Sequence, residues 1–443
     1  MHFTGSAHSA RSVLPKPVGS PEDVLVLKGG RPLQGIWRVD GAKNAALPLM
    51  VATLLTDGLV TLTNLPGILD VAVLAELLSS LGVEQHWSYA EIGLRATFAG
   101  VRVTGQPDPE GVRRMRASFL ILGPLMARTG IATVALPGGD AIGSRPVDIH
   151  LDGLRALGAE IEMEHGLITA RAPTGLKGAR YTLGFPSVGA TEHLVMTATL
   201  AEGRTELINC AREPEVTDLC RLLAAMGAKI DGIGTDRLTI HGGERLGGAV
   251  HRTIPDRIEA GTIIVAAAVS GGRVELRGPT LDDLGAAYSL LTATGVRLTE
   301  VEGGLIAEAD ASGLIGTDFV TQPYPGVATD LQPPLMALML RAAGSARIDE
   351  TLFENRFRHV DDLRRLGADI TVRGRTALVR GVPRLTGAPV RGTDVRAASC
   401  LAIAGLMAEG ETILEGLDHL DRGHAAFAER LAALGADVTR HGR

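Results

Sequence analysis

Apolar segments with helical spacing, each ending at a glycine and followed by an alternating strand, recur along the chain. Six copies, among them ELLSSLGVEQ and DDLRRLGADIT, share this pattern; five of them place an apolar residue directly before the glycine, and an apolar residue follows it in all six. A glycine after such a segment is typical of a helix C-terminus, because glycine adopts positive φ without steric cost. The glycines of these copies are Gly82, Gly158, Gly227, Gly295, Gly367 and Gly435.

A second pattern of the same kind, seen in ATLAEGRTELIN and GLMAEGETILEG, precedes each copy. Its glycines are Gly58, Gly130, Gly203, Gly272, Gly344 and Gly410. Each repeat therefore holds two helices and several strands in about 70 residues. Because one repeat cannot bury its own apolar faces, the pattern predicts an α/β protein with two domains of three repeats, helices inside and sheets outside.

Composition narrows the class of protein. The 443 residues are 45% hydrophobic, which is enough for two domain cores, and the formal net charge of −6 argues against a protein that coats nucleic acid. A ring-shaped DNA clamp could also be built from α/β repeats, but it would carry Lys and Arg on its repeated helices, which are here mostly Ala and Leu.

The cysteines and the N-terminus bear on the compartment. Cys210, Cys220 and Cys400 have no disulfide or zinc spacing and are interpreted as buried apolar residues in a reducing cytoplasm. Residues 1–22 are expected to form a flexible extension without signal-peptide character. No apolar run is long enough for a membrane span, and neither a metal nor a cofactor is expected.

Charged residues in the loops between repeats are the candidates for chemistry. Lys43, after Gly41 and before Asn44, is either an anion ligand at a helix N-terminus or a solvated lysine, and spacing favours neither. Arg116 starts an apolar run, where charged residues are usually solvated. Asp330 precedes an apolar helix and is adequately explained as its N-cap.

The segment LPGGDAIGSRPVDIH resembles a lid. Gly138, Gly139 and Gly143 surround Asp140, and Arg145 follows, which is typical of loops that close over a substrate, although an ordinary hairpin would also fit. His150 at its end either shapes the loop or is an ordinary core or surface histidine, which is the default reading, and the twelve histidines form no recognisable ligand cluster.

Three arginines in the last two repeats are expected at junctions of a strand and a helix. Arginine suits bidentate capture of carboxylate and phosphate groups. Together with Lys43 and Arg145 they predict a cationic pocket for a small, multiply charged anion. These arginines are Arg356, Arg396 and Arg422.

From about residue 25 onward the sequence resembles the UDP-N-acetylglucosamine enolpyruvyl transferases, which belong to the EPSP synthase superfamily. The motifs GAKNAALP, MRAS, LPGGDAIGSRPVDIH, FPSVGATE, AREPEV, PDRIEAGT, TDLQP, FENRF, TDVRA and DRG occur in the family's order. The resemblance implies a two-domain inside-out α/β barrel of six βαβαββ repeats. Its domains would comprise residues 23–42 with 255–443, and residues 43–254, the latter carrying the mobile loop.

The resemblance also implies an activity and its partners. The family transfers the enolpyruvyl group of phosphoenolpyruvate to the 3-hydroxyl of UDP-N-acetylglucosamine and releases phosphate, the first committed step of peptidoglycan synthesis. These small molecules would be the only partners of a cytoplasmic monomer that binds neither nucleic acid nor membrane.

The implied roles of the site residues follow the family's motifs. Asp140 would protonate C3 of phosphoenolpyruvate, and Asp330 would take the proton from the sugar hydroxyl, with Lys43 and Arg396 also in the catalytic set. The residues implied for phosphoenolpyruvate are Lys43, Asn44, Arg145, Arg356, Arg396 and Arg422. Those implied for the UDP-sugar are Asn44, Arg116, Arg145, Pro146, Val147, Asp148, Ile149, Ser187, Val188, Gly189, Asp330 and Leu352.

Two positions depart from the common family pattern. Asp140 stands where the commonest members have cysteine, so we expect resistance to fosfomycin, an epoxide that alkylates a thiolate. Phe185 stands where some members have a lysine near the nucleotide, which removes one expected phosphate contact.

Three related readings remain open. A paralogue that acts on uridine monophosphate would share the uridine and phosphoenolpyruvate sites, and Asn44 with Asp330 favours the amino sugar over it. The RPVDIH and SVGATE motifs disfavour the shikimate 3-phosphate enzyme. An inert binding paralogue is disfavoured because the charged site residues are all retained.

Overall fold

The computed structural model describes residue 14 and residues 22–442, which divide into two compact units. The first unit comprises Gly41–Gly139 and Arg145–Ile254. The second comprises residues 22–40, Asp140–Ser144 and residues 255–442. Most of the extension expected at residues 1–22 therefore lies outside the described residues. None of the described helices is both long and apolar enough to cross a membrane.

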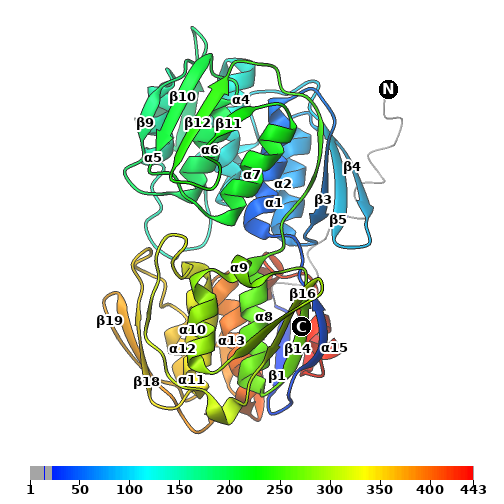
Figure 1. Cartoon of the computed structure of the whole chain (residues 1–443), viewed down its shortest axis with the longest axis vertical. Coiled ribbons are helices and arrows are strands. Elements are labelled where there is room, and N and C mark those ends of the chain that lie inside the picture. The colour runs from blue at the N-terminus through cyan, green and yellow to red at the C-terminus, as the bar shows by residue number, and fades with distance from the viewer. Residues whose placement is uncertain (1–13, 15–21, 443) are drawn as a thin grey trace. The chain divides into compact units, whose positions relative to one another are not determined.

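The first unit contains three separate sheets and a set of helices (Figure 1). The sheets have the strand orders β13-β3-β5-β4, β6-β8-β7 and β11-β12-β10-β9. The strands are β3 (Val60–Leu65), β4 (Glu84–Tyr89), β5 (Leu94–Ala99), β6 (Ile131–Ala135), β7 (Glu160–Glu164), β8 (Leu167–Arg171), β9 (Arg180–Thr182), β10 (Gly203–Ile208), β11 (Lys229–Asp231), β12 (Arg237–Gly242) and β13 (Ala249–Arg252). The helices are α1 (Lys43–Ala52), η2 (Thr53–Leu55), α2 (Leu69–Ser80), α3 (Pro109–Arg113), η3 (Ala117–Ile121), α4 (Leu122–Thr129), α5 (Asp148–Ala156), α6 (Val188–Ala198) and α7 (Pro214–Ala225).

The second unit repeats this plan. Its sheets have the orders β15-β16-β14-β2, β17-β18-β20-β19 and β22-β24-β1-β25, with a small sheet β21-β23. The strands are β1 (Val24–Lys28), β2 (Gln34–Arg38), β14 (Arg273–Arg277), β15 (Arg297–Val301), β16 (Gly304–Glu308), β17 (Phe319–Val320), β18 (Ser345–Asp349), β19 (Asp369–Arg373), β20 (Thr376–Arg380), β21 (Leu385–Thr386), β22 (Pro389–Arg391), β23 (Ala408–Glu409), β24 (Glu411–Glu415) and β25 (Asp437–His441). The helices are α8 (Arg257–Ser270), α9 (Leu281–Leu284), α10 (Ala286–Thr294), η4 (Ala311–Gly313), η5 (Thr329–Leu331), α11 (Gln332–Arg341), α12 (Val360–Arg365), α13 (Val395–Met407), α14 (Leu417–Asp421) and α15 (Phe427–Ala433).

Three helices that are apolar on every side form the centre of the second unit. Helices α8, α11 and α13 pack against one another, and nearly all of their residues are buried (Figure 1). A helix without a polar face must be covered all round, and here the sheets supply that cover. The predicted α/β fold with helices inside and sheets outside is therefore confirmed. The described strands form separate sheets and do not close into a hydrogen-bonded barrel.

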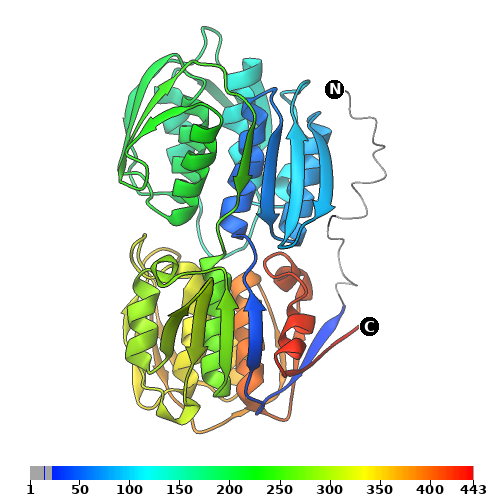
Figure 2. The ribbon, with the colours of Figure 1, turned by 45° about the vertical axis from the view of Figure 1, so that its right-hand side comes forward.

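Strands that are far apart in the sequence complete several sheets. Within three repeats a strand, a helix and a parallel neighbouring strand follow in order, as in β9–α6–β10. In two other sheets the parallel partner comes from another repeat, because β2 pairs with β14 and β13 pairs with β3. Strand β1 is antiparallel to both β24 and β25, so the first described strand completes the last sheet (Figure 2).

The repeat glycines behave as predicted except at two positions. All six glycines of the first set have positive φ, and so do four of the second set. The exceptions are Gly58 and Gly272, where a Cβ atom would lie 2.4 Å from the Gly248 nitrogen and 2.2 Å from the Leu33 oxygen. Each precedes one of the two strands, β3 and β14, that pair outside their own repeat. Glycine is required there for close backbone approach rather than for positive φ.

Candidate active site

The first unit holds Lys43 at the start of helix α1. Its ammonium group lies 2.8 Å from a carboxylate oxygen of Asp70, in the first turn of α2, and the two side chains are 11% and 5% exposed. Asn44 beside it is exposed. The solvated-lysine reading of Lys43 is therefore wrong. Its buried partner Asp70 was missed, because nothing in its local sequence distinguishes it from an ordinary acid in a first helical turn.

Two guanidinium groups lie near one another in the same unit. Arg116 immediately precedes η3, and its Nη2 atom donates to the Pro146 carbonyl oxygen at 3.2 Å. Burial, together with the positive charge of Arg145, lowers the pKa of Arg116 to about 10. Arg116 is thus partly buried beside a second cation, unlike the solvated residue expected from its position. Paired cations of this kind suit a phosphate or diphosphate.

Two helix N-termini carry most of the remaining candidates in this unit. Helix α5 begins at Asp148 after the N-cap Val147, and α6 begins at Val188 after the N-cap Ser187, whose hydroxyl accepts a hydrogen bond from the Ala190 N–H at 3.3 Å. The helices pack together. Such N-termini attract anions, because their first N–H groups and dipoles point outward.

A pair of buried histidines joins these helices and was not foreseen. The Nδ1 atoms of His150 on α5 and His193 on α6 lie 3.0 Å apart. Burial lowers the pKa of His193 to about 3, and burial with the charges of His193 and Arg116 lowers the pKa of His150. Both rings are therefore neutral in the folded protein, and His150 is a core histidine on α5 rather than a residue of the loop.

The buried His193 ring gives a testable dependence of stability on pH. An unfolded histidine titrates near about 6.5, so below that pH the unfolded chain binds a proton that the folded protein does not. This residue then lowers the free energy of unfolding by about 1.4 kcal/mol per pH unit as the pH falls. In His193→Gln, the loss of stability between about pH 7.5 and about pH 5 should be smaller by about 2 kcal/mol in urea unfolding. His86→Gln, on the exposed side of β4, should keep the wild-type pH dependence, and an unchanged slope in His193→Gln would contradict the prediction.

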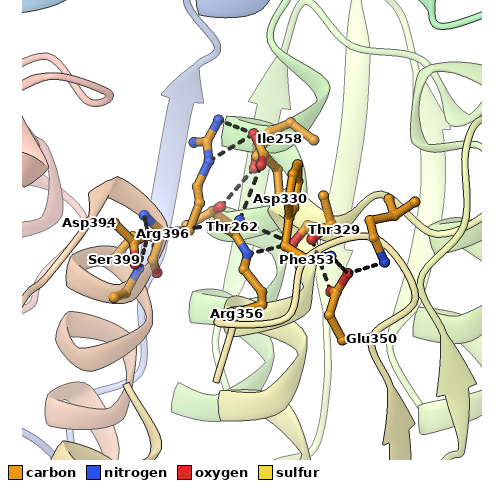
Figure 3. Close-up of polar contacts among 12 residues, drawn as sticks. Ile258, Thr262, Thr329, Asp330, Glu350, Phe353, Arg356, Asp394, Arg396 and Ser399 are labelled. Atoms are coloured by element: carbon orange, nitrogen blue, oxygen red, sulfur yellow. Dashed lines mark hydrogen bonds and ion pairs between the residues drawn. The ribbon is translucent and has the colours of Figure 1, made fainter. Parts of the chain in front are cut away.

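In the second unit, Asp330 lies between two buried arginines (Figure 3). Its Oδ1 atom is 3.1 Å from Nη2 of Arg356, and its Oδ2 atom accepts from Nη2 and Nε of Arg396 at 2.9 and 3.2 Å. The arginine side chains are 2% and 6% exposed, and that of Asp330 is 27% exposed. Burial lowers the pKa of Arg396, but Asp330 and Asp256 more than offset this and hold it above its ordinary value.

The simple reading of Asp330 as a helix N-cap is wrong. Ala328 is the N-cap of η5 and Leu331 that of α11, and neither element has a side-chain cap. Asp330 instead uses both carboxylate oxygens for the arginines. The two guanidinium groups thus already form a carboxylate-binding site within this unit.

Two buried acids that the sequence analysis did not select hold this cluster in place. Asp394 caps α13, accepting from the N–H groups of Arg396 and Ala397 at 2.9 and 3.1 Å. Glu350 accepts from the Thr329 hydroxyl at 2.9 Å and from the Leu352 N–H at 2.8 Å (Figure 3). The role of Asp394 could have been predicted from the sequence, because an acid directly before an apolar run is a common helix N-cap.

The segment around Asp140 is bound to the loop that carries Arg356. The Asp140 carboxylate lies 2.8 Å from Nη1 of Arg422. The Ile142 carbonyl accepts from the Asn355 N–H at 3.0 Å, and the Ala141 carbonyl from Arg358 at 3.1 Å.

Three arginines were predicted at junctions of a strand and a helix, and two of them lie there. Arg356 lies between β18 and α12, and Arg396 is in the first turn of α13, which follows β22. Arg422, however, is the C-cap of the short helix α14 rather than a residue between a strand and a helix.

The three cysteines are free and buried. Burial raises the pKa of Cys210 and that of Cys220 to about 12, and it raises the pKa of Cys400 as well. A reactive cysteine needs a stabilised, accessible thiolate. The interpretation of these residues as buried apolar side chains is confirmed.

Comparison with known proteins is consistent with this arrangement. Residues 27–431 match the family described as EPSP synthase (3-phosphoshikimate 1-carboxyvinyltransferase). The chain is 54% identical over 419 residues to a UDP-N-acetylglucosamine 1-carboxyvinyltransferase of Acidiphilium cryptum, covering 94% of this chain and 99% of the relative. It is 52% identical over 427 residues to the protein of the same name from Rhodospirillum centenum, again covering 94% and 99%.

Solved structures show the same fold. The enolpyruvyl transferase NikO from Streptomyces tendae superimposes with a TM-score of 0.86 at 27% identity, covering 96% of this chain and 100% of that one. An EPSP synthase from Acinetobacter baumannii superimposes with a TM-score of 0.73 at 20% identity, covering 95% and 100%.

Proposed function

The chain belongs to the EPSP synthase family of enolpyruvyl transferases, and from this premise we propose that it transfers the enolpyruvyl group of phosphoenolpyruvate to the 3-hydroxyl of UDP-N-acetylglucosamine and releases phosphate. This reaction is the first committed step of peptidoglycan synthesis. The choice of UDP-N-acetylglucosamine as the acceptor is supported by the name that the relatives share. The observation that carries the proposal is the Asp330 carboxylate held by two buried arginines, because the donor substrate also presents a carboxylate.

The proposed donor contacts are five cationic side chains. Arg356 and Arg396 bind the carboxylate of phosphoenolpyruvate in the place that Asp330 now occupies, and Lys43, Arg145 and Arg422 bind its phosphate. Three of these cations have carboxylate partners in Asp330 and Asp140, and Lys43 has Asp70. Substrate binding therefore exchanges anionic partners, which limits the cost of holding several buried cations.

Most of the proposed acceptor contacts lie on helix N-termini and loops of the first unit, and Asp330 and Leu352 belong to the second. Arg116 and Arg145 provide positive charge, and the first turns of α5 and α6 provide N–H groups for the diphosphate or uridine. Asn44 and Asp330 contact the sugar. The full set proposed for the UDP-sugar is Asn44, Arg116, Arg145, Pro146, Val147, Asp148, Ile149, Ser187, Val188, Gly189, Asp330 and Leu352.

The chemistry needs one acid and one base. Asp140 acts in its protonated form, which is favoured when Arg422 turns to the substrate phosphate and leaves Asp140 beside that dianion. It then gives its proton to C3 of phosphoenolpyruvate, which leaves positive character at C2. Asp330 takes the proton of the 3-hydroxyl as the sugar oxygen bonds to C2, and a tetrahedral ketal results. Removal of a C3 proton with loss of phosphate then restores the double bond, and the cationic ligands stabilise the departing phosphate. From the resemblance to the UDP-N-acetylglucosamine enolpyruvyl transferases we also expect that the enzyme acts in the cytoplasm as a monomer.

Phosphate release from phosphoenolpyruvate tests the proposal. The purified protein is offered UDP-N-acetylglucosamine, uridine monophosphate or shikimate 3-phosphate, and inorganic phosphate is measured. Release with the UDP-sugar, with a product heavier by one enolpyruvyl group, is the expected result. Release with uridine monophosphate alone would move the protein to a nucleotide pathway, and no release with any acceptor would favour an inert binding paralogue.

A further inference from the structure

A chain of hydrogen bonds through two imidazole rings connects three helices of the first unit. The Gly123 N–H, in the first turn of α4, donates to Nε2 of His193 on α6 at 2.7 Å. The Nδ1 atom of His193 lies 3.0 Å from Nδ1 of His150 on α5. The ring of His193 thus caps the N-terminus of one helix and contacts the side chain of another.

The backbone donor fixes the position of every proton in this chain. A peptide N–H can only donate, so Nε2 of His193 is an acceptor and carries no hydrogen. His193 is neutral, and its proton is therefore on Nδ1, from which it donates to Nδ1 of His150. That nitrogen is then an acceptor, so the proton of the neutral His150 ring lies on Nε2.

Close packing surrounds the His193 ring. His193 is fully buried, and Phe119 meets both rings edge to face, with centroid distances of 5.3 Å to His150 and 5.8 Å to His193. A Cβ atom at Gly123 would lie 2.6 Å from Nε2 of His193 and 2.0 Å from Oγ1 of Thr197. The glycine thus makes room for the ring at the helix end.

His150, at the other end of this chain of hydrogen bonds, lies close to the first turn of α6. A Cβ atom built on Gly189 would lie 3.4 Å from Cε1 and 3.7 Å from Nε2 of His150. His150 also directly follows the segment from Arg145 to Ile149. Both stretches are in the set proposed above for the UDP-sugar.

We propose that His193 is a positioning residue for the UDP-sugar: it holds His150 in the tautomer with its proton on Nε2 and thereby fixes the first turns of α5 and α6. The inference rests on the proposed function, since it names the same acceptor. His193 touches no substrate itself. Its loss should weaken acceptor binding while leaving phosphoenolpyruvate binding and the chemical step unchanged.

Two substitutions separate the two hydrogen bonds of the ring. In His193→Asn the side-chain amide can occupy the place of Nδ1 and donate to His150, but it does not reach Gly123. In His193→Gln the amide oxygen can occupy the place of Nε2 and accept from Gly123, but the donor to His150 is lost. Each variant removes one bond and retains the other.

The experiment combines ring spectroscopy with kinetics on the full chain. Long-range proton–nitrogen correlation of ¹⁵N-histidine-labelled protein reports the His150 tautomer, with the signal assigned by its absence in His150→Gln. We expect His193→Asn to keep the wild-type tautomer and KM for UDP-N-acetylglucosamine even if it unfolds more easily. We expect His193→Gln to show a mixed tautomer and a KM raised about 3- to 10-fold, with kcat and the KM for phosphoenolpyruvate unchanged.

The contrary outcomes are distinct. Two results would overturn the positioning role. In the first, His193→Gln loses the wild-type His150 tautomer but keeps its KM for UDP-N-acetylglucosamine. In the second, both variants raise this KM equally, in proportion to their loss of stability. An inactive wild-type protein would overturn the proposed function and with it the substrate named here. The tautomer measurement needs no substrate, so it shows in that case whether the proton chain itself exists.

Discussion

Asp330→Asn is expected to lower kcat by about 10²- to 10⁴-fold while tightening the binding of phosphoenolpyruvate. An amide cannot take the proton of the sugar hydroxyl, and general base catalysis contributes a factor of that size. In the wild-type protein, substrate carboxylate must displace Asp330 from Arg356 and Arg396. Asparagine offers only one acceptor oxygen to the two guanidinium groups. The incoming carboxylate then gains about one or two hydrogen bonds relative to wild type, so its Kd should fall by about 3- to 10-fold.

Rates of phosphate release and calorimetric titration with phosphoenolpyruvate measure the two effects separately. Asp369→Asn is a matched control, because Asp369 pairs with Arg380 at 3.1 Å with both side chains about half exposed. That substitution should leave both quantities unchanged. A kcat for Asp330→Asn within a few-fold of wild type would remove Asp330 from the role of base, and weaker donor binding would show that the arginines do not receive the substrate carboxylate.

Asp140→Cys is expected to convert a fosfomycin-resistant enzyme into one that the epoxide inactivates completely. The wild-type protein should keep its full activity in fosfomycin, because all three of its cysteines are buried and the pKa of each thiol is raised. A thiol at position 140 would instead lie beside the guanidinium of Arg422, which is 2.8 Å from the present carboxylate. A neighbouring cation favours the thiolate, which is the form that opens the epoxide.

Residual activity after incubation, with mass spectrometry of the intact chain, measures this effect. Asp140→Ser has a similar side-chain size but no thiol, and it should stay unmodified by fosfomycin whatever its own activity. One adduct of fosfomycin mass on Asp140→Cys is expected, mapped to the segment that contains position 140. Rapid inactivation of the wild-type protein would contradict the prediction, as would resistance of an active Asp140→Cys variant.

The internal repeats made it possible to predict the α/β fold from the sequence. Helix C-terminal glycines recur at a regular spacing, and their positive φ is a local property that sequence pattern can report. The repeat pattern did not predict that β2 pairs with β14 or that β13 pairs with β3. Strand exchange between repeats depends on backbone contacts such as that of Gly272 with Leu33, and a glycine that makes room for a neighbour resembles one that ends a helix.

The candidate site was only half predictable for a related reason. Lysine and arginine stand out in apolar surroundings, so the pattern selected Lys43, Arg356 and Arg396. Their carboxylate partners are set by tertiary structure: Arg396 and Asp330 are 66 residues apart in the chain. Asp70 and Glu350 look like ordinary surface acids until the fold buries them. His193 was missed because its role depends on a ring nitrogen meeting a backbone N–H in another helix.

The pairing of β1 with β24 and β25 has a consequence for the order of events during protein synthesis. Residues 24–28 leave the ribosome long before residues 411–415, and at about 5–20 residues per second the interval is roughly 20–80 s. The segments of the first unit, by contrast, follow one another almost without interruption from Gly41 to Ile254. That unit can fold while β1 and β2 still lack their partners and present unpaired edges to chaperones. The unit that is begun first during translation is therefore completed last.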